Sequence, residues 1–191
     1  MNSWSDESLL ASFAKGRDEA FVVLMNRYSP TIKGYAVRIV RTEELAEEIC
    51  TETFYRIAVQ RGKWEYRGIS FKSYLFRIAH NLAIDIIRKQ KLHRRKEGEV
   101  IQFSEIQRQQ STPEEDVVQK ERAQMLHRAM EELTVEEREL IVLRTTHGFS
   151  SKEAAGILNI TATQVDAKYA YARKKLKKTI GALYERQRRL S

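Results

Sequence analysis

The chain has 191 residues and a formal net charge of +8, and it contains only 8 glycines and 2 prolines. Few helix breakers beside abundant Ala, Leu, Glu, Lys and Arg predict an all-α protein of one or two domains. The single cysteine, Cys50, excludes an internal disulfide framework and favours a reducing compartment, so we expect a cytoplasmic location. No apolar run is long enough for a signal peptide or a membrane span.

The N-terminal stretch predicts two helical segments. The first should begin near Ser5, turn Leu9, Leu10 and Phe13 inward and end near Gly16. Apolar side chains keep helical spacing from residue 18 to residue 41. Pro30 falls within this segment, and we expect it to break the helix or to kink it.

Thr42 caps a third predicted helix, whose two faces differ in charge. Its inner face gathers small and apolar side chains, namely Ala46, Ile49, Cys50, Thr53 and Ile57. Its outer face carries the acidic and aromatic residues Glu44, Glu47, Glu48, Glu52 and Tyr55. Phosphate repels such a ridge, so in a basic protein it indicates a basic protein partner rather than DNA.

The loop from residue 60 to residue 70 places aromatic rings between cations. Trp64 and Tyr66 alternate there with Arg61, Lys63 and Arg67. This pattern suits an unpaired base, because rings stack on bases while cations hold the backbone. The alternative is that Trp64 packs onto the protein core, and the loop alone does not decide between the two.

Ser70 opens a fourth helix beside this loop. Its periodicity predicts an inner face of Phe71, Leu75, Ile78, Leu82 and Ile86. The outer face would then carry Ser73, Arg77, His80, Asn81, Ile84 and Arg88. A basic surface beside the aromatic loop favours the nucleic-acid interpretation of that loop.

Periodicity is lost between residues 94 and 111, which we interpret as a flexible linker. The fold class we predict is therefore two small helical domains, residues 1–93 and 112–191, joined by that linker. Thr112, Pro113 and Glu115 open the second domain with a capping box. Its first helix should turn apolar residues inward, among them Met125, Leu126, Ala129 and Met130.

Further capping boxes at Thr134 and Ser150 lead to a helix-turn-helix. Asn159 suits the left-handed position after a helix end, and Thr161 caps the helix that follows. That last helix turns Val165, Tyr169, Ala172 and Leu176 inward. Its outer face shows Thr163, Gln164, Ala167, Ala170, Tyr171 and Lys174.

Charge distinguishes this unit from an ordinary helical hairpin. Residues 161–191 hold nine basic side chains against two acidic ones. A face that needed only solubility would mix the signs more evenly. Motif and charge together predict a helix that reads duplex DNA.

Three segments resemble, in order and spacing, the second conserved region of bacterial sigma factors: DEAFVVLMNRY, ELAEEICTETFYRIA and FKSYLFRIAHNLAIDIIRK. The run LTVEERELIVLRTTHGFSSKEAAGILNITATQVDAKYAYARKKL is similar to their fourth region. Two such regions with a short linker resemble the extracytoplasmic-function (ECF) group. The resemblance implies a transcription initiation factor that binds core RNA polymerase, recognises promoter DNA and is held inactive by a membrane-anchored anti-sigma factor.

The resemblance also assigns roles to residues. Polymerase would be bound by Glu47, Glu48, Glu52 and Tyr55. The −10 element would be opened and held by Lys63, Trp64, Tyr66, Arg67, Tyr74, Arg77, His80, Asn81 and Arg88. The −35 element would be read by Thr163, Gln164, Asp166, Ala167, Lys168, Ala170, Tyr171, Arg173 and Lys174.

This chain departs from the family pattern at four places. Thr163-Gln164 stands where a glycine-threonine pair is common, and Tyr74 stands where a tryptophan is frequent. Asp166 and Ala170 lie where basic or larger side chains are frequent. The carboxylate of Asp166 could accept a hydrogen bond from cytosine or complement the helix dipole, and the sequence leaves both open.

Two other functions, a stand-alone regulator and an enzyme, fit the sequence less well. A stand-alone, dimeric helix-turn-helix regulator would explain the C-terminal half, but it would not need the Trp64 loop. An enzyme is disfavoured, because His80, His93, His127 and His147 lack metal-ligand spacing and no glycine-rich phosphate loop is present. We therefore expect no cofactor, no metal, no small-molecule substrate and no direct insertion into a membrane.

Overall fold

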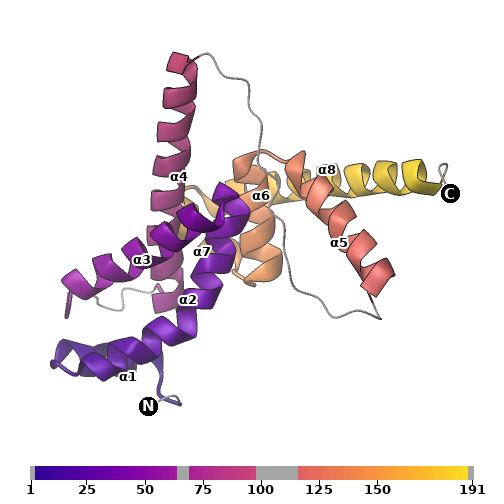
Figure 1. The fold of residues 1–191 in the computed structure, drawn as a ribbon. Helices are drawn as coiled ribbons and strands as arrows, with labels where there is room; N and C mark the ends of the chain where they lie inside the picture. Colours follow the sequence, from indigo (N-terminus) through magenta and orange to yellow (C-terminus); the bar gives the residue numbers. More distant parts are fainter. Residues whose placement is uncertain (1–2, 64–68, 98–115, 189–191) are drawn as a thin grey trace. The chain divides into compact units, whose positions relative to one another are not determined.

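The computed structural model describes residues 3–63, 69–97 and 116–188. Every regular element in these ranges is helical, which confirms the predicted all-α class (Figure 1). The described part before residue 98 forms one compact unit, and most of the described part after residue 115 forms a second. The linker boundaries drawn from the sequence fall largely outside the described residues and stay a prediction.

The first unit consists of α1 (Asp6–Ala14), α2 (Asp18–Val40), α3 (Glu43–Val59) and α4 (Phe71–Glu97). Helix α2 is its centre, because it packs against each of the other three. The rings of Tyr35 on α2 and Phe76 on α4 are fully buried and meet at a centroid distance of 5.0 Å. This core holds α3 and α4 in place and leaves their outer faces free.

Polar contacts attach α1 to α2. Arg27 donates to Asp6 at 2.5 Å, and the Tyr28 hydroxyl donates to the other oxygen of the same carboxylate. Burial, followed by this hydrogen bond, raises the pKa of Tyr28 far above its ordinary value of 10.0. Helix α1 is therefore a fixed part of the unit.

Pro30 does not break its helix, contrary to one expectation from the sequence. Helix α2 continues from Asp18 to Val40 with Pro30 in its interior. Leu24 before the proline and Ile32 after it are both completely buried. Packing on both sides thus compensates for the backbone hydrogen bond that the proline cannot donate.

The inner face of α4 also differs from the predicted one. Phe71 and Leu75 are buried as expected, whereas Ile78, Leu82 and Ile86 are only half-buried. Their places in the core are taken by Phe76, Ala79 and Ala83. The helix faces two neighbours, α2 and α3, so its buried stripe is displaced from the row of largest side chains.

Two further details of α4 correct the sequence analysis. Ser73, expected on the outer face, is buried, and its hydroxyl lies 2.9 Å from that of Ser70. The helix continues to Glu97 rather than ending before Arg94. Strongly helix-forming lysine and arginine residues there extend the helix without any apolar periodicity.

The described chain after residue 115 contains α5 (Asp116–Glu131), α6 (Val135–Ile141), a π-helical turn (Val142–Thr146), α7 (Ser151–Leu158) and α8 (Ala162–Arg188), and all of it except residues 156–159 belongs to the second unit. Leu133, Ile141 and Ala172 form the centre of a core that packs against Met130, Tyr169 and Leu176. The capping box at Thr134 is confirmed, with the Thr134 amide donating to Glu137 at 2.8 Å.

The predicted inner face of α5 is correct only in part. Ala129 is fully buried, but Leu126 is 48 % exposed. Helix α8 covers one side of α5 only, so an apolar side chain away from that contact stays in solvent. The capping residues expected before this helix, Thr112, Pro113 and Glu115, lie outside the described residues.

Candidate protein and nucleic-acid interfaces

The charge-divided helix expected from the sequence is α3. The Thr42 hydroxyl accepts from the Leu45 amide and so fixes where the helix begins. All five residues of the predicted inner face are buried. Glu44, Glu47 and Glu48 are therefore exposed on the other side, together with Tyr55, which is 61 % exposed.

The acidic residues of α3 differ in their pairing. Lys33 on α2 binds Glu47 at 2.6 Å and lies 3.8 Å from Glu43. The hydrogen bond to Glu47 is the main cause that raises the pKa of Lys33 above its ordinary value. Arg56 binds Glu52 at 2.8 Å within the same helix.

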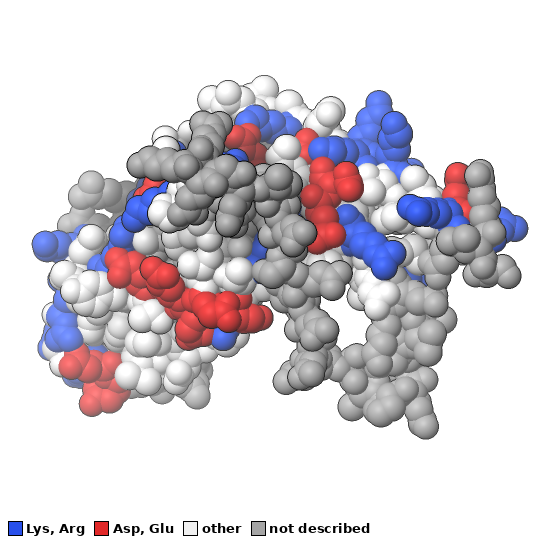
Figure 2. All heavy atoms as spheres, turned by 45° about the horizontal axis from the view of Figure 1, so that its top comes forward, with Lys and Arg blue, Asp and Glu red and all other residues white. Residues whose placement is uncertain are grey.

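Glu44 and Glu48 are different, because neither has a cationic partner among the described residues. Figure 2 shows acidic side chains gathered into a continuous strip over the part of the molecule where α3 lies. The paired carboxylates stabilise the unit, and the unpaired ones leave negative charge available to a partner.

The residues expected to hold the −10 element divide into two groups. Trp64, Tyr66 and Arg67 lie outside the described residues, so their predicted role stays a prediction. Lys63 is described, and it is exposed just after the C-terminal end of α3.

Tyr74 on α4 is held by two contacts. Its hydroxyl donates to Gln60 at 3.2 Å, and the Arg77 guanidinium lies 5.4 Å from its ring centroid. The ring also lines a small hollow beside Leu10 and Phe13 of α1. Sequence patterns do not indicate this part of α1, because Leu10 and Phe13 have the spacing of ordinary core residues.

The remaining predicted residues of α4 follow Tyr74 along the helix. Arg77 and His80 are half-buried, whereas Asn81 and Arg88 are exposed. Arg88 lies 3.5 Å from Asp85, an exposed pair of little energetic value. The structure therefore places Tyr74, Arg77, His80, Asn81 and Arg88 on one helix, with Tyr74 and Arg77 in its first two turns and Arg88 farther along it.

The helix-turn-helix forms as the capping pattern predicts. The Ser150 amide donates to Glu153 at 2.9 Å, and the Thr161 amide donates to Gln164 at the same distance. Between the two helices Asn159 adopts a left-handed φ of 53°. The second helix, α8, buries Val165 and Ala172 completely.

The outer face of α8 is open to solvent. Its exposed side chains include all six that the sequence places there: Thr163, Gln164, Ala167, Ala170, Tyr171 and Lys174. Tyr171 is 62 % exposed. Arg173 is exposed too, but its guanidinium lies 5.6 Å from the ring centroid of Tyr169, which Arg144 approaches at 5.4 Å.

Three polar contacts fix α8 in its unit. The Ser151 hydroxyl donates to Asp166 at 2.5 Å, which joins α7 to α8. Lys168 binds Glu136 at 2.7 Å, and Lys175 binds Glu137 at 2.9 Å, which joins α8 to the first turn of α6. Asp166 therefore has a role within the protein that neither alternative from the sequence included.

Comparisons with known proteins agree with this arrangement. Residues 24–93 match the sigma-70 region 2 family, and residues 123–176 match sigma-70 region 4. The chain is 30 % identical to the RNA polymerase sigma factor CarQ of Myxococcus xanthus, over 90 % of this chain and 95 % of CarQ. It is also 30 % identical to the ECF RNA polymerase sigma factor SigW of Bacillus subtilis, over 87 % of this chain and 91 % of SigW.

The chain belongs to the ECF group of RNA polymerase sigma factors. It is thus a transcription initiation factor that directs promoter-specific transcription. Its fold is also similar to that of the sigma factor RpoE of Bartonella quintana, solved in complex with the anti-sigma factor NepR. That likeness has a TM-score of 0.73 and 21 % identity, over 86 % of this chain and 98 % of RpoE.

Within the described ranges, no three His, Cys, Asp or Glu side chains are grouped closely enough to hold a metal ion. None of the helices in those ranges combines the length and apolarity needed to cross a bilayer.

Proposed function

We propose that this sigma factor binds core RNA polymerase through the outer face of α3, at Glu47, Glu48, Glu52 and Tyr55, with Glu44 as a further contact. The support is the pairing pattern, since Glu44 and Glu48 have no cation of their own among the described residues. Unpaired carboxylates attract a basic partner without first giving up an internal ion pair. The exposed Tyr55 adds an aromatic anchor of the kind that dominates protein interfaces.

The N-terminal unit would also capture the −10 element. Tyr74, Arg77, His80, Asn81 and Arg88 would meet the DNA from α4, together with Lys63, Trp64, Tyr66 and Arg67 from the loop. No covalent step is required, because a surface that binds unpaired bases more tightly than paired ones shifts DNA toward the open form. Stacking contributes about 1–3 kcal/mol per base, which offsets the few kcal/mol that opening a pair costs.

Helix α8 would read the −35 element through its exposed outer face. Thr163, Gln164, Ala167, Ala170, Tyr171, Arg173 and Lys174 are the candidate contacts. Asp166 and Lys168 would act on DNA indirectly, by fixing the position of α8 against α7 and α6. A helix held at several points presents its outer face at one angle, which base recognition requires.

Regulation would come from an anti-sigma factor, as in the RpoE complex with NepR. We place this sigma factor in the cytoplasm beside RNA polymerase and its anti-sigma factor at the membrane. We assign it no catalytic activity, since binding alone performs each of the steps above.

The observation that carries this proposal is the separation of unpaired charge, negative on α3 and positive on α8. The experiment is a selection of random duplex DNA by the reconstituted holoenzyme, with the free chain as a parallel sample. We expect the holoenzyme to enrich two different elements at a fixed spacing. Enrichment of a palindrome by the free chain would instead indicate a stand-alone dimeric regulator.

A further inference from the structure

Helix α8 extends beyond the residues that match sigma-70 region 4. The match ends at residue 176, but α8 continues without a break to Arg188. On one side of this extension Ile180 and Leu183 are half-buried. The other side, with Gly181, Ala182 and Glu185, is exposed to solvent.

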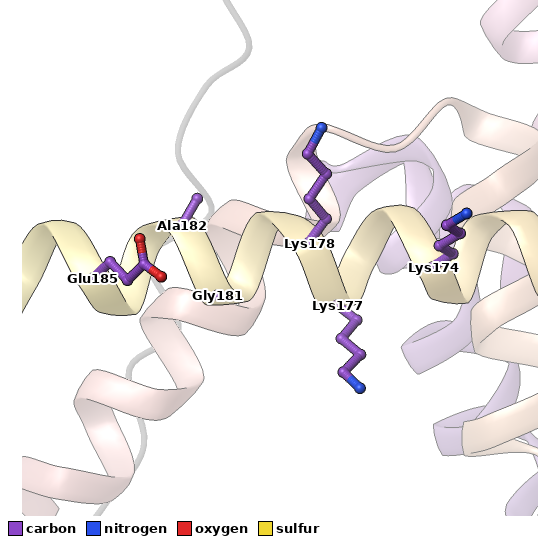
Figure 3. A pocket seen from close by; sticks show the side chains of 6 residues that line it. All are labelled: Lys174, Lys177, Lys178, Gly181, Ala182 and Glu185. Carbon is purple, nitrogen blue, oxygen red and sulfur yellow. The ribbon is translucent and has the colours of Figure 1, made fainter.

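That solvent-facing side carries a cluster of lysines. Lys174 and Lys178 lie one turn apart on α8, and Lys177 is next to Lys178. The three line a shallow hollow with Gly181, Ala182 and Glu185, and Figure 3 shows the side chains of Lys177 and Lys178 on either side of it. All three lysines are exposed, and none has an acidic partner within the described part of the chain. Lys168 and Lys175 of the same helix are already neutralised by glutamates of α6.

Two of the three lysines, Lys174 and Lys178, continue the outer face that precedes them, and Lys177 lies beside it. Ala167, Tyr171, Lys174, Lys178 and Gly181 follow one another at helical spacings of four and three residues. They therefore form one stripe along the axis of α8. If the first half of this stripe faces DNA, the second half faces it too, because the helix is unbroken.

The distance along the helix indicates which part of the DNA the lysines meet. From Thr163 to Lys174 the axis rises about 16 Å, at about 1.5 Å per residue. The major groove of B-DNA is about 12 Å wide, so a helix that enters with Thr163 has reached a groove edge at Lys174. The groups at that edge are phosphates.

We infer that Lys177 and Lys178, with Lys174, bind backbone phosphates at the edge of the major groove that α8 occupies. This inference rests on the proposed recognition of the −35 element by α8. The contact is independent of base sequence, and it adds affinity and fixes the angle of the helix. Gly181 and Ala182 have small side chains beside the lysines, so the sugar-phosphate chain can approach the helix closely there. Glu185 would repel phosphate and so marks the end of the proposed contact.

The test measures how salt affects binding of the holoenzyme to a duplex that the selection described above has enriched. Each phosphate contact contributes about 0.9 to the slope of log affinity against log salt. The double variant Lys177→Ala/Lys178→Ala should therefore reduce the slope by about 1.8. Its deficit relative to the wild type should shrink about tenfold between 50 and 200 mM salt, with the base preference unchanged.

Lys175→Ala is the matched control. It removes the same charge from the same helix, but Lys175 is already paired with Glu137 of α6. We expect its salt slope to equal that of the wild type. Equal slopes for the double variant and the wild type would overturn the inference, as would an equal reduction in both variants.

A second variant tests the close approach at Gly181. An added Cβ there meets nothing within 4 Å, so Gly181→Gln should fold and raise the melting temperature through better helix propensity. We expect it to weaken DNA binding by holding the phosphates away, and unchanged binding would contradict the close approach.

The outcomes separate this inference from the function on which it rests. If the selection enriches no −35 element, the proposed reading by α8 is wrong. If it enriches one and the double variant keeps its slope, only the phosphate contact is wrong. Neutral methylphosphonates at the groove edge should abolish the difference between double variant and wild type. If they do not, the lysines serve another acidic ligand, such as a protein segment, and the inference fails.

Discussion

Helices α3 and α8 have the same design with opposite charge. Each begins at a threonine cap, buries one apolar stripe and exposes a tyrosine, Tyr55 at 61 % and Tyr171 at 62 %. On each helix some charged side chains bind their own unit and others have no partner among the described residues. The comparison teaches that ion pairs within a unit help to hold each helix in place, whereas the unpaired charges can bind a partner without first giving up an ion pair.

The largest expected effect tests whether the two surfaces can be separated. Val165 on the inner face of α8 is completely buried, so Val165→Asp places an unpaired charge in the core of the second unit. We expect a loss of about 3–5 kcal/mol of unfolding free energy in that unit. Hydrogen exchange should show the loss in α5 to α8 and not in α1 to α4, and loss of protection in both units would contradict separability.

The two exposed tyrosines provide a matched exchange. Tyr171→Ala should weaken holoenzyme binding to promoter DNA by about 1–2 kcal/mol, roughly five- to thirtyfold, and leave polymerase binding unchanged. Tyr55→Ala should do the reverse, with a loss of similar size in affinity for core polymerase. Titrating each variant against core polymerase and against promoter DNA measures these four affinities. A loss of polymerase binding in Tyr171→Ala, or of DNA binding in Tyr55→Ala, would contradict the comparison.

A smaller effect concerns the contact between Ser151 and Asp166. If Asp166 positions α8, then Ser151→Ala and Asp166→Ala should not be additive in the unfolding free energy, with a coupling of about 0.5–1.5 kcal/mol. Asp166→Asn keeps an oxygen that can accept from Ser151 and should restore most of the stability.

Base preference distinguishes positioning from direct reading of DNA. We expect Ser151→Ala and Asp166→Ala to weaken binding to all −35 sequences alike in a holoenzyme selection. If Asp166→Ala relaxed the preference at one base pair and Ser151→Ala did not, Asp166 would be reading a base.

The smallest effect is a dependence on pH at the contact between α6 and α8. Burial raises the pKa of Glu137, but hydrogen bonds from Lys175 and Thr134 outweigh it and hold the pKa below its ordinary 4.5. Glu137 therefore stabilises the folded state above about pH 4.5, and this contribution is lost as the pH falls through the folded pKa. Denaturation of Glu137→Gln should show a deficit below about 1 kcal/mol at pH 7 that shrinks toward pH 3.5; a constant deficit would contradict this assignment.

Local rules predicted much of the fold from the sequence. The caps at Thr42, Thr134, Ser150 and Thr161 form as expected, because each depends on residues only three positions apart. The inner face of α3 was also predicted, since its small and apolar residues keep one period.

Features that depend on distant neighbours were missed. The helix through Pro30 continues because buried residues on both sides hold it, and Leu126 is exposed because α8 covers only one side of α5. The division of charges was missed for the same reason. No spacing rule shows that Lys168 binds Glu136, 32 residues away in the sequence. Nor does one show that Lys178 has no acidic partner within the described residues.

The most direct measurement is the affinity of core RNA polymerase for the wild-type chain, for Glu44→Lys/Glu48→Lys and for Glu19→Lys as a control. Glu19 is exposed in the first turn of α2, on a different helix of the same unit. We predict that the double reversal weakens binding about hundredfold, roughly 2.7 kcal/mol, while the control binds as the wild type does. Unchanged affinity in the double reversal, or an equal loss in the control, would contradict the assignment of α3 as the polymerase-binding surface.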